Sequence, residues 1–179
     1  HIEGNIGAGK SSLGELLKEN GFVFFKEDLN YDILNLFYSN QKRWMFTTQV
    51  NFLLSFKKIF ETIKSDFKHS DVIFMERSPF STMIFARVGF EKNLLTKMEY
   101  DTLDCLYKEL EWEIKNFQFK WIYLFTDKEE CLKRIKQRNR VFEKNITLDY
   151  LTSLEEKMNV FQHYPTISGK ESTKEIYDK

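Results

Sequence analysis

The chain has 179 residues and 42% hydrophobic residues, so it is long enough to bury the core of one domain and is not expected to be disordered. Its 27 lysines and arginines balance 27 aspartates and glutamates, which argues against a broad nucleic-acid-binding or membrane surface. No apolar run approaches the roughly 18 residues that cross a bilayer. The two cysteines, Cys105 and Cys131, form no disulfide or metal pattern, so we expect a reducing compartment.

The first feature along the chain is the motif G-x-x-x-x-G-K-[ST] at residues 4–11, which is typical of a loop that cradles nucleotide phosphates. In such a loop the backbone N–H groups converge on phosphate oxygens, Lys10 reaches the β and γ phosphates, and Ser11 offers its hydroxyl to Mg²⁺. A helix that follows adds the positive end of its dipole. The alternative is a chance match in a glycine-containing turn, which the neighbouring strand and helix patterns disfavour. The candidate nucleotide-binding residues are Gly4, Asn5, Ile6, Gly7, Ala8, Gly9, Lys10, Ser11 and Ser12.

Short apolar segments then alternate with helical patterns. Strands are expected at residues 21–26, 71–75 and 120–125, after a first strand of which only residues 1–3 remain, so we expect that the sequence is trimmed at its start. Helices are expected at residues 11–20, 29–38, 44–67, 80–90, 97–117, 127–138 and 148–161, with His69 near a helix end and Asp127 as an N-cap. The tail, residues 168–179, is polar and expected to be loose. This alternation predicts an α/β fold with a parallel sheet and helices on both faces.

Acidic residues follow two of the expected strands, at the sheet edge where ligands of such folds bind. Glu27 follows the segment GFVFFK and is a candidate general base for an alcohol acceptor. The alternative is an exposed acidic turn shared with Asp28. Glu76 and Arg77 follow the segment VIFM, where Glu76 can orient Mg²⁺ and Arg77 can clamp a transferring group. The alternative there is a buried structural ion pair.

A basic cluster occupies residues 131–140, CLKRIKQRNR. Arg134 and Arg138 are four residues apart and share one helix face. The alternatives are a solvated helix face or a nucleic-acid-binding patch. Because the net charge is zero and no matching basic stretch lies elsewhere, the pattern favours a mobile arginine lid over a triphosphate, with Arg140 included.

Together these segments resemble one family, the deoxyribonucleoside kinases, which includes thymidine, deoxycytidine and deoxyguanosine kinases. IEGNIGAGKSS resembles the phosphate loop of the family, KEDL its E-P-[VI] stretch, and LFYSNQKRWMFTTQ its segment ending in a base-reading glutamine. MERSPFS resembles its E-R-S motif, KRIKQRNRVFE its lid, and DYLTSLEEKM the helix after the lid. The resemblance runs from Ile2 to about Phe161 and implies a three-layer P-loop NTPase fold, with a kinase domain at residues 1–167 and a tail at 168–179.

By position, the resemblance implies a role for each matching residue. Glu27 would take the proton from the sugar 5′-hydroxyl, with Arg77 near that hydroxyl and the phosphoryl group, and Glu76 would help to place Mg²⁺. Tyr38 and Glu143 would bind the sugar 3′-hydroxyl, and Gln49 would hydrogen-bond the base edge. The lid arginines would be Arg134, Arg138 and Arg140. The implied reaction transfers the γ-phosphate of ATP to a deoxynucleoside in a homodimeric, cytoplasmic enzyme, with a mitochondrial location left open by the trimmed start.

Base preference is inferred from the residues expected around Gln49. Asp28 replaces the proline of the family, and the final strand is not evident in SGKESTKEIYDK. Phe52 or Leu53, together with Phe56, would give an apolar wall, and Phe85 is a candidate for stacking on the base. Thr82 is small and neutral where a cytidine- and purine-preferring relative would place an acidic residue. We therefore expect a pyrimidine preference, with thymidine as the best substrate and deoxycytidine second.

Two other readings stay open. A nucleoside monophosphate kinase, such as a thymidylate kinase, would share the fold, but its anionic acceptor would be repelled by the carboxylate of Glu27. A non-catalytic subunit on the same fold, such as an accessory subunit of respiratory complex I, would be expected to lose loop residues. Gly4, Gly9, Lys10 and Ser11 are all present, which argues against that reading.

Overall fold

The computed structural model describes residues 1–68 and 71–178, so the expectation for His69 lies outside the described residues. The chain divides into two compact units. One comprises His1–Glu27, Val72–Ser78 and Phe119–Lys179, and the other comprises Asp28–Asp71 and Pro79–Gln118. Every strand found in the described residues belongs to the first unit, and the second unit is helical.

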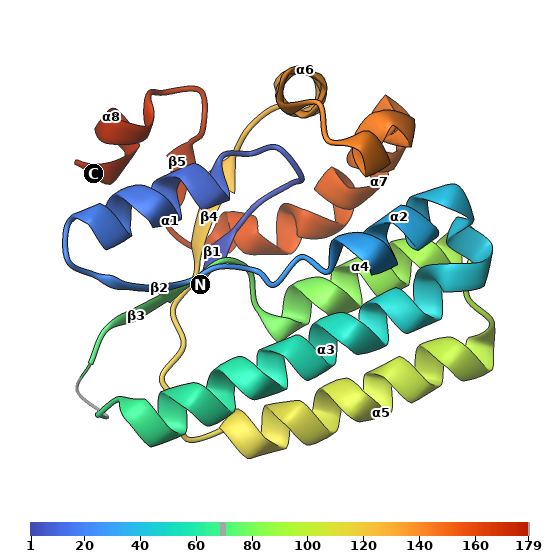
Figure 1. Ribbon diagram of the computed structural model, residues 1–179, viewed down its shortest axis with the longest axis horizontal. Coiled ribbons are helices and arrows are strands. Elements are labelled where there is room, and N and C mark those ends of the chain that lie inside the picture. Colours follow the sequence, from blue (N-terminus) through green and yellow to red (C-terminus); the bar gives the residue numbers. More distant parts are fainter. Residues whose placement is uncertain (69–70, 179) are drawn as a thin grey trace. The chain divides into compact units, whose positions relative to one another are not determined.

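The first unit is built on a parallel sheet (Figure 1). β1 pairs with β4 and β4 with β5, while β2 pairs with β3, all in parallel register. A parallel bridge between Ile2 and Glu76 joins the two sets, which gives the order β2-β3-β1-β4-β5. The strands are β1 Ile2–Glu3, β2 Val23–Phe25, β3 Ile73–Met75, β4 Ile122–Phe125 and β5 Thr166–Ser168. The expected parallel sheet is confirmed, and the strand ends that carry Glu27 and Glu76 lie on neighbouring strands.

Helices cover both faces of this sheet. Successive strand residues point to opposite sides, so the apolar strands place apolar side chains on both faces, and each face needs a cover. On one face, Ile2 and Leu124 pack with α1 and α8 through Leu13, Leu17 and Ile176. On the other face, the ring of Tyr123 stacks on Phe161, with ring centroids 6.1 Å apart. The helical elements of this unit are α1 Lys10–Glu19, α6 Lys128–Arg138, η1 Val141–Asn145, α7 Leu148–Met158, η2 Asn159–His163 and α8 Thr173–Tyr177.

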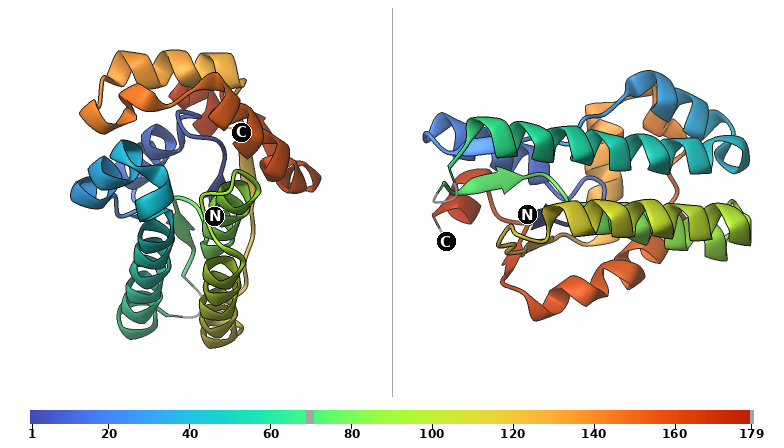
Figure 2. Two further views of the ribbon diagram at one scale, coloured as in Figure 1. Left: turned by 90° about the vertical axis from the view of Figure 1, so that its right-hand side faces the viewer. Right: turned by 90° about the horizontal axis from the view of Figure 1, so that it is seen from below.

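In its described residues the second unit has four helices, α2 Tyr31–Ser39, α3 Gln41–Asp66, α4 Pro79–Glu91 and α5 Lys97–Ile114. α3 packs against the other three, and α4 also packs against α5 (Figure 2). Asn30 and Asn40 cap α2 and α3, and Thr96 forms a capping box with Glu99 at the start of α5. Within the described residues, no helix combines the length and apolarity needed to span a bilayer.

The C-terminal segment differs from the sequence-based expectation of a loose tail. β5 adds to the sheet beside β4, and α8 packs on α1 with Ile176 buried. The sequence contains the reason, since Ser172 and Glu175 form a capping box that starts α8. The final strand, which was not evident from the sequence, therefore exists as β5, and the boundary expected between residues 167 and 168 falls inside it. Asp127 also differs from expectation: its side chain makes no cap bond to α6 and pairs with Lys170 instead.

Candidate active site

The phosphate loop connects β1 to α1, and glycine is required where the loop turns. Gly7 has φ 84°, in the left-handed region that side chains disfavour. A Cβ at Gly7 would lie 2.7 Å from the carbonyl oxygen of Cys131, so no side chain fits there. Asn5 fixes the loop from the other side, because its Nδ2 donates to the carbonyl of Leu151 at 2.9 Å and its Oδ1 accepts from the N–H of Ile6. The loop is thus held rigidly before α1 begins.

The start of α1 is suited to an anion. Its N-cap residue, Gly9, offers no side-chain oxygen to the first N–H groups of the helix, whereas α2, α3, α5, α7 and α8 all have side-chain caps. Uncapped N–H groups and the positive end of the helix dipole together favour a phosphate at this position.

Lys10 is buried at the centre of the loop, with 5% of its surface exposed. Its Nζ donates to the carbonyl oxygens of Gly4 at 3.0 Å and Asn5 at 2.9 Å. Burial, together with the nearby Arg77 guanidinium, lowers the pKa of Lys10 to about 8, against the opposing effect of Glu76. The ammonium is thus poised to gain stability from an arriving polyanion.

We expect nucleotide triphosphate binding to take up a proton near pH 8. The free protein loses the Lys10 proton around a pKa of about 8, and bound phosphates raise that pKa, so the bound form keeps the proton. The Kd for ATP should therefore weaken as the pH rises above 8, by at most about tenfold per pH unit. Calorimetry at pH 8.5 in two buffers of different ionisation heat measures the uptake. Lys10→Arg, which stays charged, should remove the pH dependence, and a parent Kd that is constant from pH 7 to 9.5 would contradict the assignment.

Ser11 and Glu76 come together beside the loop. The hydroxyl of Ser11 donates to Oε1 of Glu76 at 2.8 Å. Oε2 of Glu76 is buried and has no hydrogen-bond partner within the described residues. A buried carboxylate oxygen beside a hydroxyl matches the hard oxygen ligands of Mg²⁺. Within residues 1–68 and 71–178, no three His, Cys, Asp or Glu side chains cluster as a metal site.

Glu27 and Arg77 form a partly buried ion pair at the ends of β2 and β3. Arg77 Nε lies 3.2 Å from Glu27 Oε2, and the two side chains are 5% and 15% exposed. Arg77 has φ 66°, a strained conformation for a non-glycine residue, and its N–H and carbonyl bond to Ile2 and His1. Burial raises the pKa of Glu27, while Arg77 opposes that rise. The predicted base and the predicted clamp are thus in direct contact.

The arginines of residues 131–140 lie near the phosphate loop and are held by specific partners. Arg134 donates to Glu130 at 3.0 Å and to the carbonyl oxygens of Ala8 at 3.2 Å and Gly169 at 2.8 Å. Arg138 forms a two-pronged pair with the carboxylate of Glu143, at 2.6 Å for both bonds.

Arg140 lies 3.4 Å from the same carboxylate of Glu143. Glu143 is only 5% exposed, and the two lid arginines Arg138 and Arg140 balance its buried charge. Its expected contact with a sugar 3′-hydroxyl stays a prediction.

A cavity of about 430 Å³ lies beside the phosphate loop within the first unit. Its walls are the phosphate loop, Glu76, the three lid arginines and the segment between β5 and α8. That last segment was missed from the sequence, although the capping-box pattern at residues 172–175 was a signal for it. The lining residues are Gly7, Ala8, Gly9, Lys10, Ser11, Ser12, Glu76, Arg134, Arg138, Arg140, Gly169, Glu171, Ser172, Thr173 and Ile176.

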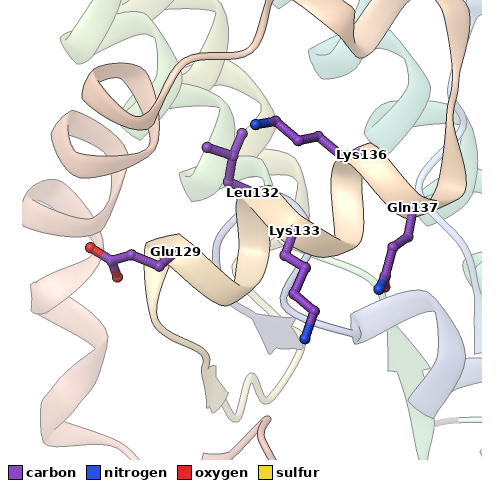
Figure 3. A pocket seen from close by; sticks show the side chains of 5 residues that line it. All are labelled: Glu129, Leu132, Lys133, Lys136 and Gln137. Atoms are coloured by element: carbon purple, nitrogen blue, oxygen red, sulfur yellow. The ribbon is translucent and has the colours of Figure 1, made fainter.

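A second hollow, of about 480 Å³, lies along α6 (Figure 3). It is lined by Glu129, Leu132, Lys133, Lys136 and Gln137, whose side chains fan outward from the helix. None of these residues belongs to the phosphate loop or to a strand end. The smaller cavity is therefore the candidate active site.

Apart from Arg77 and Glu143, the residues expected to bind the substrate belong to the second unit. Gln49 lies on the buried stripe of α3, with its Nε2 3.7 Å from the sulfur of Met45 and its Oε1 without a hydrogen-bond partner in the described part of the chain. A buried amide with such weak partners is suited to a polar ligand. The other five residues are Tyr38, Phe52 and Phe85, which are half-buried, and Phe56 and Thr82, which are buried. Their contacts with a substrate stay predictions.

The parallel sheet, the phosphate loop and the helix that follows define an α/β nucleotide-binding protein of the P-loop NTPase type. A family model for deoxynucleoside kinases matches residues 1–178. The chain therefore belongs to the deoxynucleoside kinase family, as the motifs implied, and is a kinase.

Individual similarities agree with this assignment. The chain is 35% identical over 87% of its length to the "Putative kinase protein 143R" of Invertebrate iridescent virus 6, covering 77% of that protein. It is 32% identical over 96% of its length to the "Putative deoxynucleoside kinase" of Frog virus 3, covering 85% of it. Other matched relatives are named as kinases of deoxyadenosine, deoxycytidine or deoxyguanosine.

The solved structure of deoxyadenosine kinase from M. mycoides with bound dATP has the same fold. Its TM-score is 0.83 at 24% sequence identity, and the match covers 99% of this chain and 94% of that one. The expected α/β fold, with helices flanking a parallel sheet, is confirmed by this similarity.

Proposed function

We propose that this kinase transfers the γ-phosphate of ATP to the 5′-hydroxyl of a deoxyribonucleoside. The observation that carries the proposal is the contact of Glu27 with Arg77 at the sheet edge that also holds Ser11 and Glu76. A mostly buried carboxylate beside an arginine suits a neutral alcohol acceptor, which needs a general base. A monophosphate acceptor would meet repulsion from Glu27, which disfavours the monophosphate kinase alternative.

The proposed chemistry assigns one task to each group. Glu27 accepts the proton of the 5′-hydroxyl as that oxygen forms its bond to the γ-phosphorus. The bond from the γ-phosphorus to the oxygen that bridges the β and γ phosphates breaks, and ADP leaves. Arg77 and the lid arginines stabilise the charge that develops on the transferring group. A raised pKa brings Glu27 closer to the working pH, where a general base is most effective.

Mg²⁺ fits the Ser11–Glu76 pair, and these two side chains would hold it. When bound, the ion would neutralise charge on the β and γ phosphates. Lys10 and the N–H groups at the start of α1 would bind the same phosphates from the loop side.

Glu27→Gln is expected to lower kcat by about 10²–10⁴-fold, the contribution typical of a general base, with little change in the Kd for ATP. Glutamine keeps the size of the side chain but cannot accept the proton. Asp28→Asn is the matched control, because Asp28 is the exposed neighbouring acid. Steady-state kinetics on both purified variants measure the effect. Equal kcat values for the two variants would favour the alternative of an acidic turn and remove Glu27 from the mechanism.

For recognition of the nucleobase, we propose that the side-chain amide of Gln49 donates one hydrogen bond to the edge of the base and accepts another from it. The sequence predicts thymidine as the best substrate, from the apolar neighbours Phe52 and Phe56 and the neutral Thr82. The names of the matched relatives favour deoxyadenosine, deoxycytidine or deoxyguanosine instead.

The test of both proposals is ATP consumption against four deoxynucleosides and their four monophosphates under one condition. We expect turnover of deoxynucleosides, with thymidine leading by a factor within the ~10–200-fold that apolar contacts discriminate. A purine that leads by tenfold or more would overturn the base preference and leave the kinase proposal intact. Turnover of monophosphates alone would overturn the kinase proposal.

A further inference from the structure

The carbonyl of Ala8 is anchored from outside the phosphate loop. Ala8 is fully buried, and its oxygen accepts a bond from the hydroxyl of Thr126 at 3.0 Å and one from Arg134 Nη1 at 3.2 Å. Thr126 follows β4 directly and is 3% exposed. A loop that turns its N–H groups inward must satisfy the carbonyls that point away, and Ala8 is satisfied by these two donors.

This anchor controls the direction of a neighbouring N–H group. The carbonyl of Ala8 and the N–H of Gly9 belong to one planar trans peptide, so they point in opposite directions. Gly7 and Gly9, on either side, have φ values of 84° and 108°. Glycine adopts many backbone conformations at low cost, so this peptide can rotate unless its carbonyl is held. Holding the carbonyl toward Thr126 directs the Gly9 N–H to the opposite side of the peptide.

Gly169 closes the space around the same contact. A Cβ at Gly169 would lie 2.0 Å from the hydroxyl of Thr126 and 2.9 Å from the oxygen of Ala8. The N–H of Gly169 donates to the carbonyl of Phe125, and its own carbonyl accepts from Arg134. Any side chain at residue 169 would therefore displace the hydroxyl or the loop.

We propose that Thr126 is a positioning residue for the phosphate loop. Its hydroxyl holds the Ala8–Gly9 peptide so that the Gly9 N–H faces the phosphates of the donor. The inference rests on the proposed function in taking a nucleoside triphosphate as that donor. Arg134 is expected to turn to the phosphates when they bind, which leaves Thr126 to hold Ala8. Thr126 acts through Ala8 and touches no reacting atom.

Thr126→Val and Thr126→Ser test this role. Valine keeps the branched shape and removes the hydroxyl, and serine keeps the hydroxyl. Loss of one buried hydrogen bond predicts that Thr126→Val weakens binding of inorganic tripolyphosphate and raises the KM for ATP by about tenfold each. The KM for the deoxynucleoside should stay within about twofold of the parent, because Thr126 acts through the phosphate loop. A change in the KM for ATP alone would mark a specific effect. Thr126→Ser should restore tripolyphosphate affinity to within about threefold.

The proposal is overturned if Thr126→Val binds tripolyphosphate as the parent does, or if Thr126→Ser is as weak as Thr126→Val. Thermal unfolding of each variant shows whether it folds. If Thr126→Val does not fold, Gly169→Ala decides the question, because its Cβ displaces the hydroxyl and should weaken tripolyphosphate binding equally. Binding of tripolyphosphate does not depend on the acceptor. A parent that binds it but phosphorylates no deoxynucleoside would therefore overturn the proposed function and leave this comparison valid.

Discussion

Lys10→Ala is expected to abolish ATP-dependent phosphoryl transfer. The substitution removes the ammonium that the loop holds between the carbonyls of Gly4 and Asn5. No other lysine lines the 430 Å³ cavity found in the described residues, so no neighbouring ammonium can replace it. The charge of Lys10 on the β and γ phosphates stabilises bound ATP and stabilises the transition state more strongly, so both ATP affinity and kcat should fall.

Steady-state kinetics and direct ATP titration of the purified variant measure this loss. Lys18→Ala is the matched control, because Lys18 is an exposed lysine in the last turn of the same helix, α1. It should retain the activity of the parent. Full activity in Lys10→Ala would remove the nucleotide-site assignment.

The double variant Arg134→Gln/Arg138→Gln is expected to lower kcat by about 10³–10⁵-fold, the range attributed to arginines that stabilise phosphoryl transfer. Arg134 holds carbonyls of the phosphate loop and of the turn after β5, while Arg138 holds Glu143. Both arginines line the candidate cavity, so each can exchange its present partner for a phosphate oxygen. The single variants should not add up to the double, since residues that act as a unit are not additive.

A charge-matched control is available on the same helix. Lys133→Gln/Lys136→Gln also removes two positive charges from α6. Both lysines are exposed, and their side chains point outward from the helix (Figure 3). This control should keep a kcat near that of the parent. DNA binding by both double variants should be measured as well. A normal kcat with lost DNA binding in the arginine variant would favour the nucleic-acid-patch alternative.

Much of the nucleotide site was predictable from local sequence. The spacing of Gly4, Gly9, Lys10 and Ser11 defines a phosphate loop because that loop is formed by contiguous residues. The positions of Glu27 and Glu76 at strand ends followed from apolar segments that alternate with helical ones. In a parallel sheet such ends meet at one edge. Periodicity also located most helices, since an amphipathic stripe is a local signal.

Contacts between distant segments were not predictable in this way. The left-handed backbone of Arg77 and its pairing with Glu27 depend on β3 lying between β1 and β2 in the sheet. The tail looked loose because its composition is polar. Its order comes from β5 pairing with β4 and from one buried side chain, Ile176, packing against α1.

The sequence by itself determined the class of ligand, because phosphate binding depends on residues that are adjacent along the chain. The tertiary structure decided which groups support that loop. The hydroxyl of Thr126 reaches the carbonyl of Ala8 across 118 residues of sequence, and Gly169 leaves room for that bond. No local pattern marks such a contact. It exists because β1, β4 and β5 are neighbours in the sheet, which places the ends of three separate segments around one carbonyl group.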